Sequence, residues 1–246
     1  MVSVRIRSTA LIPLMCTLAC SSSDDGAKPP EPIPVHVSGD AFAFTLPGNP
    51  YGHIDGGTLS VLEAPDVSTV TDTNGHFELD GLMSGQTATF VLVAQDFPEA
   101  QTKSFTLPRG DLEKVTFQVP NQTLFDILAS GLKITPDPKR CQIVSTITRV
   151  GKSIYDSGAH GEAGATVTIE PAVDATSGPI YFNANVIPDR TLTESSEDGG
   201  VVFLNVPEGE YTLTAHKDGV KFVPVHAKCR ANVLVNASPP YGLQAL

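Results

Sequence analysis

The stretch DTNGHFELDGLMSGQTATFVLVAQD, residues 72–96, decides the fold of this 246-residue chain. In its segment HFELDGL apolar and polar residues alternate, and this period of two is typical of a β-strand with one buried face. Asn74-Gly75 is a turn pair that can adopt positive φ, and Gly85 marks a second turn before the apolar run TFVLV. The stretch therefore predicts two strands joined by a tight turn.

A second stretch, SEDGGVVFLNVPEGEYTLTAHKDG at residues 196–219, has the same order of features. Two glycines and two apolar residues of the first stretch each have a counterpart 124 residues later (199 − 75). The four pairs are Gly75 and Gly199, Leu79 and Phe203, Leu82 and Val206, and Gly85 and Gly209. This coincidence favours an internal repeat, with chance similarity between two β-rich segments as the alternative.

The same signature extends outward over most of the chain. Turn residues separate the short β-rich runs TLSVLEA, TFVLVAQ, KVTFQVP, QIVSTIT, ATVTIEP, IYFNANV, VVFLNV, YTLTAHK and VKFVPVHA. Short runs at this spacing favour antiparallel sandwiches. We predict an all-β chain with two antiparallel β-sandwiches in tandem, over residues 39–120 and 141–246.

Both copies resemble a known family. The segments GATVTIEP and ESSEDGGVVFLNVPEGEYTLTAHKDGVKF of the second copy, and GGTLSVLEAPDVSTVTDTNGHFELDGL of the first, resemble carboxypeptidase regulatory-like domains, a transthyretin-like β-sandwich group. The resemblance covers residues 39–120 and 141–236, and in the first copy Ser84-Gly85-Gln86 replaces the usual Pro-x-Gly-x-Tyr corner. Such domains are appendages, spacers or binding modules, so the resemblance implies a role without catalysis.

The segment between the copies, NQTLFDILASGLKITPDPKR at 121–140, has helical spacing. Apolar residues fall on one face, Asn121 is a suitable N-cap, and Gly131 with the following prolines ends the segment. The stripe consists of Leu124, Ile127, Leu128 and Leu132. We predict a short helical connector whose stripe packs on a neighbouring sandwich or is left for a partner.

The N-terminus is typical of an exported protein. Arg5 and Arg7 precede an apolar run at 10–18, which is less than half of the roughly 20 residues that a membrane-spanning helix needs. The segment TLAC at 17–20 resembles the lipobox of bacterial lipoproteins, with Thr17 in place of the usual leucine. The resemblance implies a signal peptide over 1–19 and a lipidated Cys20. An ordinary signal peptide cut near the serine run is the alternative.

Residues 20–38 are rich in serine and proline and lack hydrophobic periodicity, which predicts an extended tether. Several acyl chains on Cys20 would anchor the chain stably. Ser21 resembles the residue that follows the cysteine in lipoproteins passed on to the outer membrane. We therefore expect a lipid anchor in the outer membrane, with the body facing the periplasm or the cell surface.

Two of the four cysteines remain once Cys16 leaves with the signal and Cys20 takes lipid. In an exported chain, Cys141 and Cys229 most simply form one disulfide. The bond would close a loop of 88 residues (229 − 141). Two free buried cysteines are the alternative.

The charge of the mature chain excludes some partners. Without Arg5 and Arg7 the chain keeps 14 basic against 27 acidic side chains, a net charge of −13. The sequence contains no cluster of lysines and arginines that would form a positive patch. Nucleic acid is therefore not expected as a partner, because its binding requires neutralised phosphates.

No sequence motif of catalysis, metal binding or cofactor binding is present, and we predict no catalytic residue, metal or cofactor. Asp156-Ser157-Gly158 has the triplet of aspartic proteases, but it lies in a glycine-rich loop and has no second copy. Strand alternation points His216 and His226 outward. The two strands diverge from the turn that joins them, so His216 is expected near that turn and His226 far from it. We interpret the triplet as part of a solvated loop and the two histidines as exposed strand residues.

Two weaker binding hypotheses remain. The acidic loop TESSEDGG at 193–200, together with Asp55 or Asp72, offers oxygen ligands for calcium. Tyr51, Tyr155 and Tyr241 offer a thin aromatic platform for sugars in a chain without tryptophan.

These observations predict a lipid-anchored structural or protein-interaction module of the cell envelope that is not an enzyme. The expected partners are the membrane, through the N-terminal lipid, and an envelope protein or glycan. The second hypothesis is a surface lipoprotein that binds glycans or matrix, and an enzyme of unrecognised type is the third.

Overall fold

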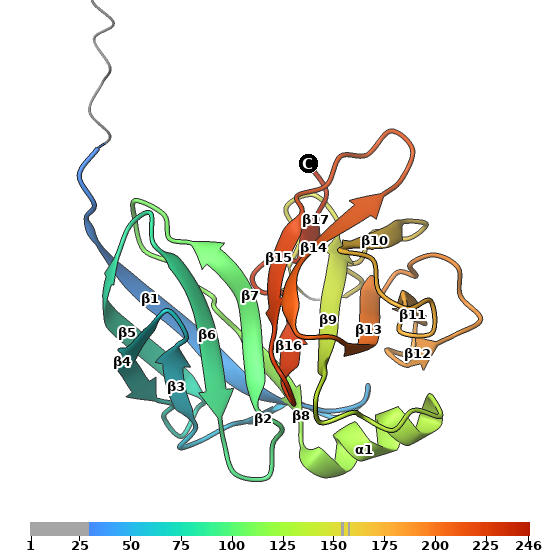
Figure 1. Cartoon of the computed structure of the whole chain (residues 1–246), viewed down its shortest axis with the longest axis horizontal. Coiled ribbons are helices and arrows are strands. Elements are labelled where there is room, and N and C mark those ends of the chain that lie inside the picture. The colour runs from blue at the N-terminus through green and yellow to red at the C-terminus, as the bar shows by residue number, and fades with distance from the viewer. Residues whose placement is uncertain (1–29, 154, 157) are drawn as a thin grey trace, which may run out of the picture. The chain divides into compact units, whose positions relative to one another are not determined.

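The structure, a computed structural model, describes residues 30–153, 155–156 and 158–246. The predicted signal peptide, Cys20 and part of the predicted tether lie outside the described residues. Residues Pro32–Leu246 form one compact unit, drawn in Figure 1. In the described part of the chain, no helix is long and apolar enough to span a membrane.

Strands are the main regular structure of this unit. The first half contains β1 (Pro34–Phe44), β2 (Gly52–His53), β3 (Thr58–Val61), β4 (Ala64–Val70), β5 (His76–Met83), β6 (Thr87–Val93), β7 (Ala100–Thr106) and β8 (Phe117–Pro120), and the helix α1 (Gln122–Gly131) follows. The second half contains β9 (Cys141–Thr148), β10 (Thr166–Glu170), β11 (Ile180–Phe182), β12 (Pro188–Asp189), β13 (Gly200–Val206), β14 (Gly209–His216), β15 (Val225–Cys229), β16 (Leu234–Asn236) and β17 (Leu243–Gln244). The predicted all-β class with a short intervening helix is confirmed.

The two halves repeat one pattern of strand pairing. In the first half, β1 pairs with β5 antiparallel and with β8 parallel, while β6 lies between β3 and β7. In the second half, β9 pairs with β13 antiparallel and with β16 parallel, while β14 lies between β10 and β15. The strands β5 and β13, which carry the matched sequence positions, occupy equivalent places. The pairing pattern therefore supports the internal repeat, although each half also contains a parallel pair that the sequence analysis did not predict.

The halves are joined through a shared sheet. Strand β16 pairs in parallel with β9 on one side and with β7 of the first half on the other. This produces a sheet of ten strands among the described residues, which we call the long sheet, in the order β12-β11-β13-β9-β16-β7-β6-β3-β4 with β17 beside β9. Figure 1 shows β16 between β9 and β7. The boundaries at residues 120 and 141 stay a prediction, because backbone pairing continues from one half to the other.

The two hydrophobic cores lie on opposite faces of the long sheet. Leu234, 5% exposed, belongs to the core of the first half, whereas Val235, 0% exposed, belongs to the core of the second. Successive side chains of a strand point to opposite faces, so one short strand serves both cores. The first-half core is covered by the sheet of β1, β2, β5 and β8, and the second-half core by β10, β14 and β15. Each end of the long sheet therefore has one face that the sandwich itself does not cover.

Candidate functional site

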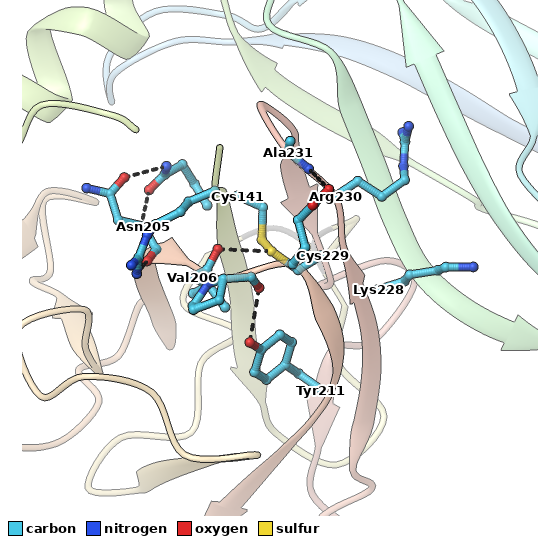
Figure 2. Close-up of a disulfide and its surroundings, with 12 residues drawn as sticks. Cys141, Asn205, Val206, Tyr211, Lys228, Cys229, Arg230 and Ala231 are labelled. Carbon is cyan, nitrogen blue, oxygen red and sulfur yellow. Dashed lines mark hydrogen bonds between the residues drawn. A yellow bond between two sulfur atoms is a disulfide. The ribbon is translucent and has the colours of Figure 1, made fainter. Parts of the chain in front are cut away.

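The predicted disulfide is present, at the end of the second half where β9 begins and β15 ends (Figure 2). Cys141 begins β9 of the long sheet and Cys229 ends β15 of the three-stranded sheet. Their Cα atoms are 5.6 Å apart, which is ordinary disulfide geometry, and both side chains are buried. The bond thus ties together the two sheets that enclose the second core, and its burial indicates a structural role.

The turn beside the disulfide is held by a tyrosine corner. Tyr211, near the start of β14, donates its hydroxyl hydrogen to the Pro207 carbonyl oxygen at 3.0 Å (Figure 2). The Val206 carbonyl oxygen lies 3.2 Å from Cys229 Sγ, a contact rather than a hydrogen bond because a disulfide sulfur carries no proton. The Pro-x-Gly-x-Tyr pattern that the first copy lacks is present in the second copy at Pro207, Gly209 and Tyr211, and its hydrogen bond closes the turn beside the disulfide.

Polar side chains also tie the second half to the first. Arg230, next to the disulfide, donates from Nη2 to Glu99 Oε1 at 2.5 Å and from Nε to Gln101 Oε1 at 2.8 Å. Gln101 in turn donates from Nε2 to the Lys228 carbonyl oxygen at 2.6 Å. These bonds extend the backbone connection made by β16 and oppose rotation of one half against the other.

A cavity of about 410 Å³ lies on the face of the long sheet that the second sandwich leaves uncovered. Its sheet wall consists of Val144, Phe182, Val202 and Leu204. Its other wall consists of Phe125, Leu128, Ala129 and Leu132 of α1 and of Ile134 after it. The predicted apolar stripe of the helix therefore faces the second half in part: Leu128 and Leu132 line the cavity, while Ile127 is 59% exposed.

Ionisable groups gather at one place in this apolar lining. Asp198 lies in the turn before β13 and accepts a hydrogen bond on Oδ2 from the Gly200 N–H at 3.0 Å. His160 lies in the loop before β10, and its Nδ1 is buried with no hydrogen-bond partner among the described residues. The two segments are bound together because the Gly161 N–H donates to the Glu197 carbonyl oxygen at 3.0 Å.

The electrostatics of the cavity follow from burial. Burial raises the pKa of the Asp198 carboxyl, an effect that the Gly200 N–H and the nearby His160 partly offset. Burial and the negative charge of Asp198 raise the pKa of the Tyr51 hydroxyl, and both side chains line the cavity. Glu197 also lines the cavity, whereas no lysine or arginine of the described residues does.

The prediction that His216 and His226 point outward is confirmed, because both residues are exposed. His216 hydrogen-bonds through Nε2 with Thr168 Oγ1 at 2.9 Å, and His226 through Nδ1 with Thr212 Oγ1 at 3.0 Å. Asp156 accepts hydrogen bonds from the backbone N–H and the hydroxyl of Ser153, so it shapes its own loop. Ser157, the next residue of that triplet, lies outside the described residues.

The calcium hypothesis gains no clustered site among the described residues. Asp72 accepts the backbone N–H groups of Asn74 and His76 and thereby closes its turn. In the part of the chain that the structure describes, no group of three or more His, Cys, Asp or Glu side chains is placed to hold a metal ion. Tyr155 packs on Lys114, whereas Tyr51 packs against Phe42 and Phe44 with ring centroids 6.4 and 5.9 Å apart.

Sequence reasoning missed the cavity and the roles of His160 and Asp198 in it. A signal was present in VVFL at 201–204, because an unbroken apolar run indicates a strand buried on both faces. Only one of those faces belongs to the sandwich core, so the other required a cover. What that cover would be, and that it would leave a cavity, depended on where α1 lies.

No protein-family model and no curated protein matches this chain. Solved structures match it distantly: the Bacillus anthracis TIE protein has 15% identity and a TM-score of 0.27, over 85% of this chain and 34% of that one. The minor pilin GBS52 of Streptococcus agalactiae has 10% identity and a TM-score of 0.26, over 86% of this chain and 96% of that one. The shaft pilin SpaA from Lactobacillus rhamnosus GG has 11% identity and a TM-score of 0.24, over 84% of this chain and 97% of that one. This chain thus spans about a third of the length of the TIE protein and nearly all of the two pilins, and these distant likenesses carry no functional assignment.

Proposed function

We propose that this protein is a non-catalytic structural and protein-interaction module of the cell envelope, anchored by lipid on Cys20. The observation that carries the proposal is the buried disulfide between Cys141 and Cys229. Disulfides of this kind persist in oxidising compartments outside the cytosol, in agreement with the export signal read at the N-terminus. The outer membrane is the location we propose, on the resemblance of Ser21 and the segment before it.

The architecture supports a role as a rigid scaffold. The shared strand β16, the disulfide and the bonds of Arg230 join both halves into one body. The ends of the long sheet are protected against pairing with other chains, because β4 begins with Ala64-Pro65-Asp66 and β12 consists of Pro188 and Asp189. Proline and charge at sheet edges discourage strand addition. Recognition is therefore assigned to side-chain surfaces rather than to a free strand edge.

The experiment that tests this proposal compares two cysteine variants in membrane fractions. Cys20→Ser should move the protein from the membrane into the soluble fraction, and intact mass of the wild type should show a chain beginning at Cys20 with added acyl mass. Cys16→Ser is the matched control, because Cys16 is removed with the signal and its change should leave the protein in the membrane. Retention of the Cys20→Ser protein in membranes would contradict the lipid anchor.

A second candidate function, binding of a glycan, is favoured by one observation. Phe42, Phe44 and Tyr51 form a group of aromatic rings at the end of β1, and Tyr51 is 45% exposed. Tyr51→Ala should abolish retention on immobilised envelope polysaccharide if this group is the platform, while Tyr241→Ala should not. Equal retention of both variants and the wild type would argue against the assignment.

A further inference from the structure

We propose that the cavity beside α1 binds a primary organic ammonium ion with an apolar body, whose ammonium group is held by Asp198 and His160. This inference goes beyond the proposed envelope function and does not depend on lipidation of Cys20. It assigns a ligand class to a space that the scaffold itself leaves open. Four features of the cavity support it: its lining, its charge, its free nitrogen and its aromatic rings.

The size and lining of the cavity suit the apolar body of a small molecule. Its volume of about 410 Å³ lies within the range of about 300 to 1,000 Å³ that is usual for ligand pockets. The sheet wall is apolar because β13 is buried along both faces, and the helix wall consists of half-buried side chains. Since no residue of α1 is fully buried, a bound apolar group would complete packing that the helix leaves incomplete.

The charge of the lining selects a cation. Asp198 and Glu197 are its carboxylates, and the lining includes no lysine or arginine among the described residues. No cation of the described residues lies within 4.0 Å of the Asp198 carboxylate, which accepts one hydrogen bond from them, from the Gly200 N–H. A largely desolvated carboxylate without a cation is unfavourable, so a ligand that supplies the positive charge gains more than a neutral one.

The imidazole of His160 selects a nitrogen that carries hydrogens. Its Nδ1 is buried and has no partner among the described residues, and this nitrogen is an acceptor when Nε2 carries the proton. The backbone fixes the residue, because the His160 carbonyl oxygen accepts the Arg149 N–H at 3.0 Å. A primary ammonium has three N–H donors, enough for both Asp198 and His160, whereas a quaternary ammonium has none.

Aromatic rings from both halves complete the charged end. Phe44 and Tyr51 of the first half line the cavity together with Phe182 of the second. The faces of such rings attract cations and repel anions. The site therefore exists only because β16 holds the two halves edge to edge, and neither half alone would contain it.

Isothermal titration with three probes of equal chain length tests the proposal: octylammonium, octyltrimethylammonium and octanoate. The protein is the full chain with Cys20→Ser, which needs no detergent. Octylammonium should bind saturably, at least fivefold more tightly than octyltrimethylammonium and at least tenfold more tightly than octanoate. Equal or tighter binding of octanoate, or no saturable binding of octylammonium up to millimolar concentration, would overturn the proposal.

Substitutions on α1 locate the binding. Ala129→Trp should fill the cavity and weaken octylammonium binding at least tenfold, whereas Ser130→Trp, on the exposed side of the same turn, should leave it within twofold. Asp198→Asn keeps an acceptor for the Gly200 N–H and should remove the preference for octylammonium over octanoate. If Ala129→Trp binds as the wild type does, the ligand lies elsewhere and the assignment is wrong. If that variant does not fold, competition between octylammonium and octyltrimethylammonium on the wild type decides the question.

Discussion

At the scale of single residues, Lys103 shows how a half-buried charge lowers stability. The residue lies in β7, its Nζ is 5.4 Å from the centroid of the Phe105 ring, and the described residues place no carboxylate within 4.0 Å of it. Burial lowers the pKa of Lys103 from 10.5 to about 8. Between about pH 8 and pH 10.5 the unfolded chain binds more protons than the folded one. The free energy of unfolding therefore rises with pH over this range, as the folded lysine loses its charge.

Lys103→Met should therefore stabilise the protein at pH 7. We expect a gain of about 1 to 2 kcal/mol in the free energy of unfolding, less than the full pKa difference implies because the side chain is only half-buried. The gain should shrink at pH 10, where the wild-type lysine is neutral in the folded state. Urea unfolding of both proteins at the two pH values measures it, and a gain that does not depend on pH would exclude the electrostatic cause.

Gly199 shows the effect of close backbone packing at the turn that carries Asp198. Gly199 and Gly219 both adopt positive φ, of 80° and 74°. A Cβ at Gly199 would lie 2.4 Å from the Ile147 carbonyl oxygen, whereas a Cβ at Gly219 would meet nothing within 4 Å. Gly219→Ala should cost about 1 kcal/mol of stability from its φ alone, and Gly199→Ala at least about 2 kcal/mol more. Similar losses in thermal unfolding would show that the turn yields to the added methyl group.

At the scale of elements, α1 depends on its N-cap. Asn121 accepts the Leu124 N–H on Oδ1 at 2.8 Å, and no residue of the helix is fully buried to compensate if that bond is lost. Asn121→Ala should destabilise the helix by about 1 kcal/mol and speed hydrogen exchange of its first turn, while strand amides keep their protection. Thr123→Ala, an exposed change in the same turn, is the control. Slower or unchanged exchange at Leu124 would contradict this role.

Strand β16 is three residues long and yet holds the two cores together. Leu234→Ala removes a side chain from the first core while the strand remains paired on both sides. We expect a loss of about 2 to 4 kcal/mol, felt by both halves in one cooperative transition. Hydrogen exchange of β6 and β14 amides in increasing urea measures this, and separate unfolding of the first half would show that the halves are independent.

At the scale of the whole molecule, the disulfide closes a loop of 88 residues that contains most of the second half. The chain-entropy relation gives a stabilisation of about 4 to 5 kcal/mol for such a loop, and measured values are often smaller. Replacing both Cys141 and Cys229 by alanine should lower the free energy of unfolding by about 2 to 5 kcal/mol. Reduction of the wild type should reproduce most of this loss, and a midpoint unchanged by reductant would argue against the bond.

Much of the fold followed from local sequence. Alternation in HFELDGL and YTLTAHK, with Gly75 and Gly219 in the turns next to them, determined the strands, and the matched spacing indicated the repeat. Cys141 and Cys229 could be paired because they were the two cysteines left in an exported chain. The strand inferences succeeded because hydrophobic period and turn chemistry depend on short segments of sequence. The disulfide inference succeeded because only two cysteines were left to pair.

What only the tertiary structure decided is how the two copies meet. The pattern predicted two sandwiches, but nothing local distinguishes Leu234 and Val235 as side chains of different cores, since that depends on which sheets face each side of β16. The cavity follows from the same fact: the halves join through non-equivalent sheets, which leaves one face of β9 and β13 bare for α1 to cover in part. His160 and Asp198 are 38 residues apart (198 − 160), and both line the cavity beside the hydrogen bond from the Gly161 N–H to the Glu197 carbonyl oxygen. Strand identity is therefore set by local chemistry, while the edge-to-edge pairing that creates the site is set by long-range backbone contacts.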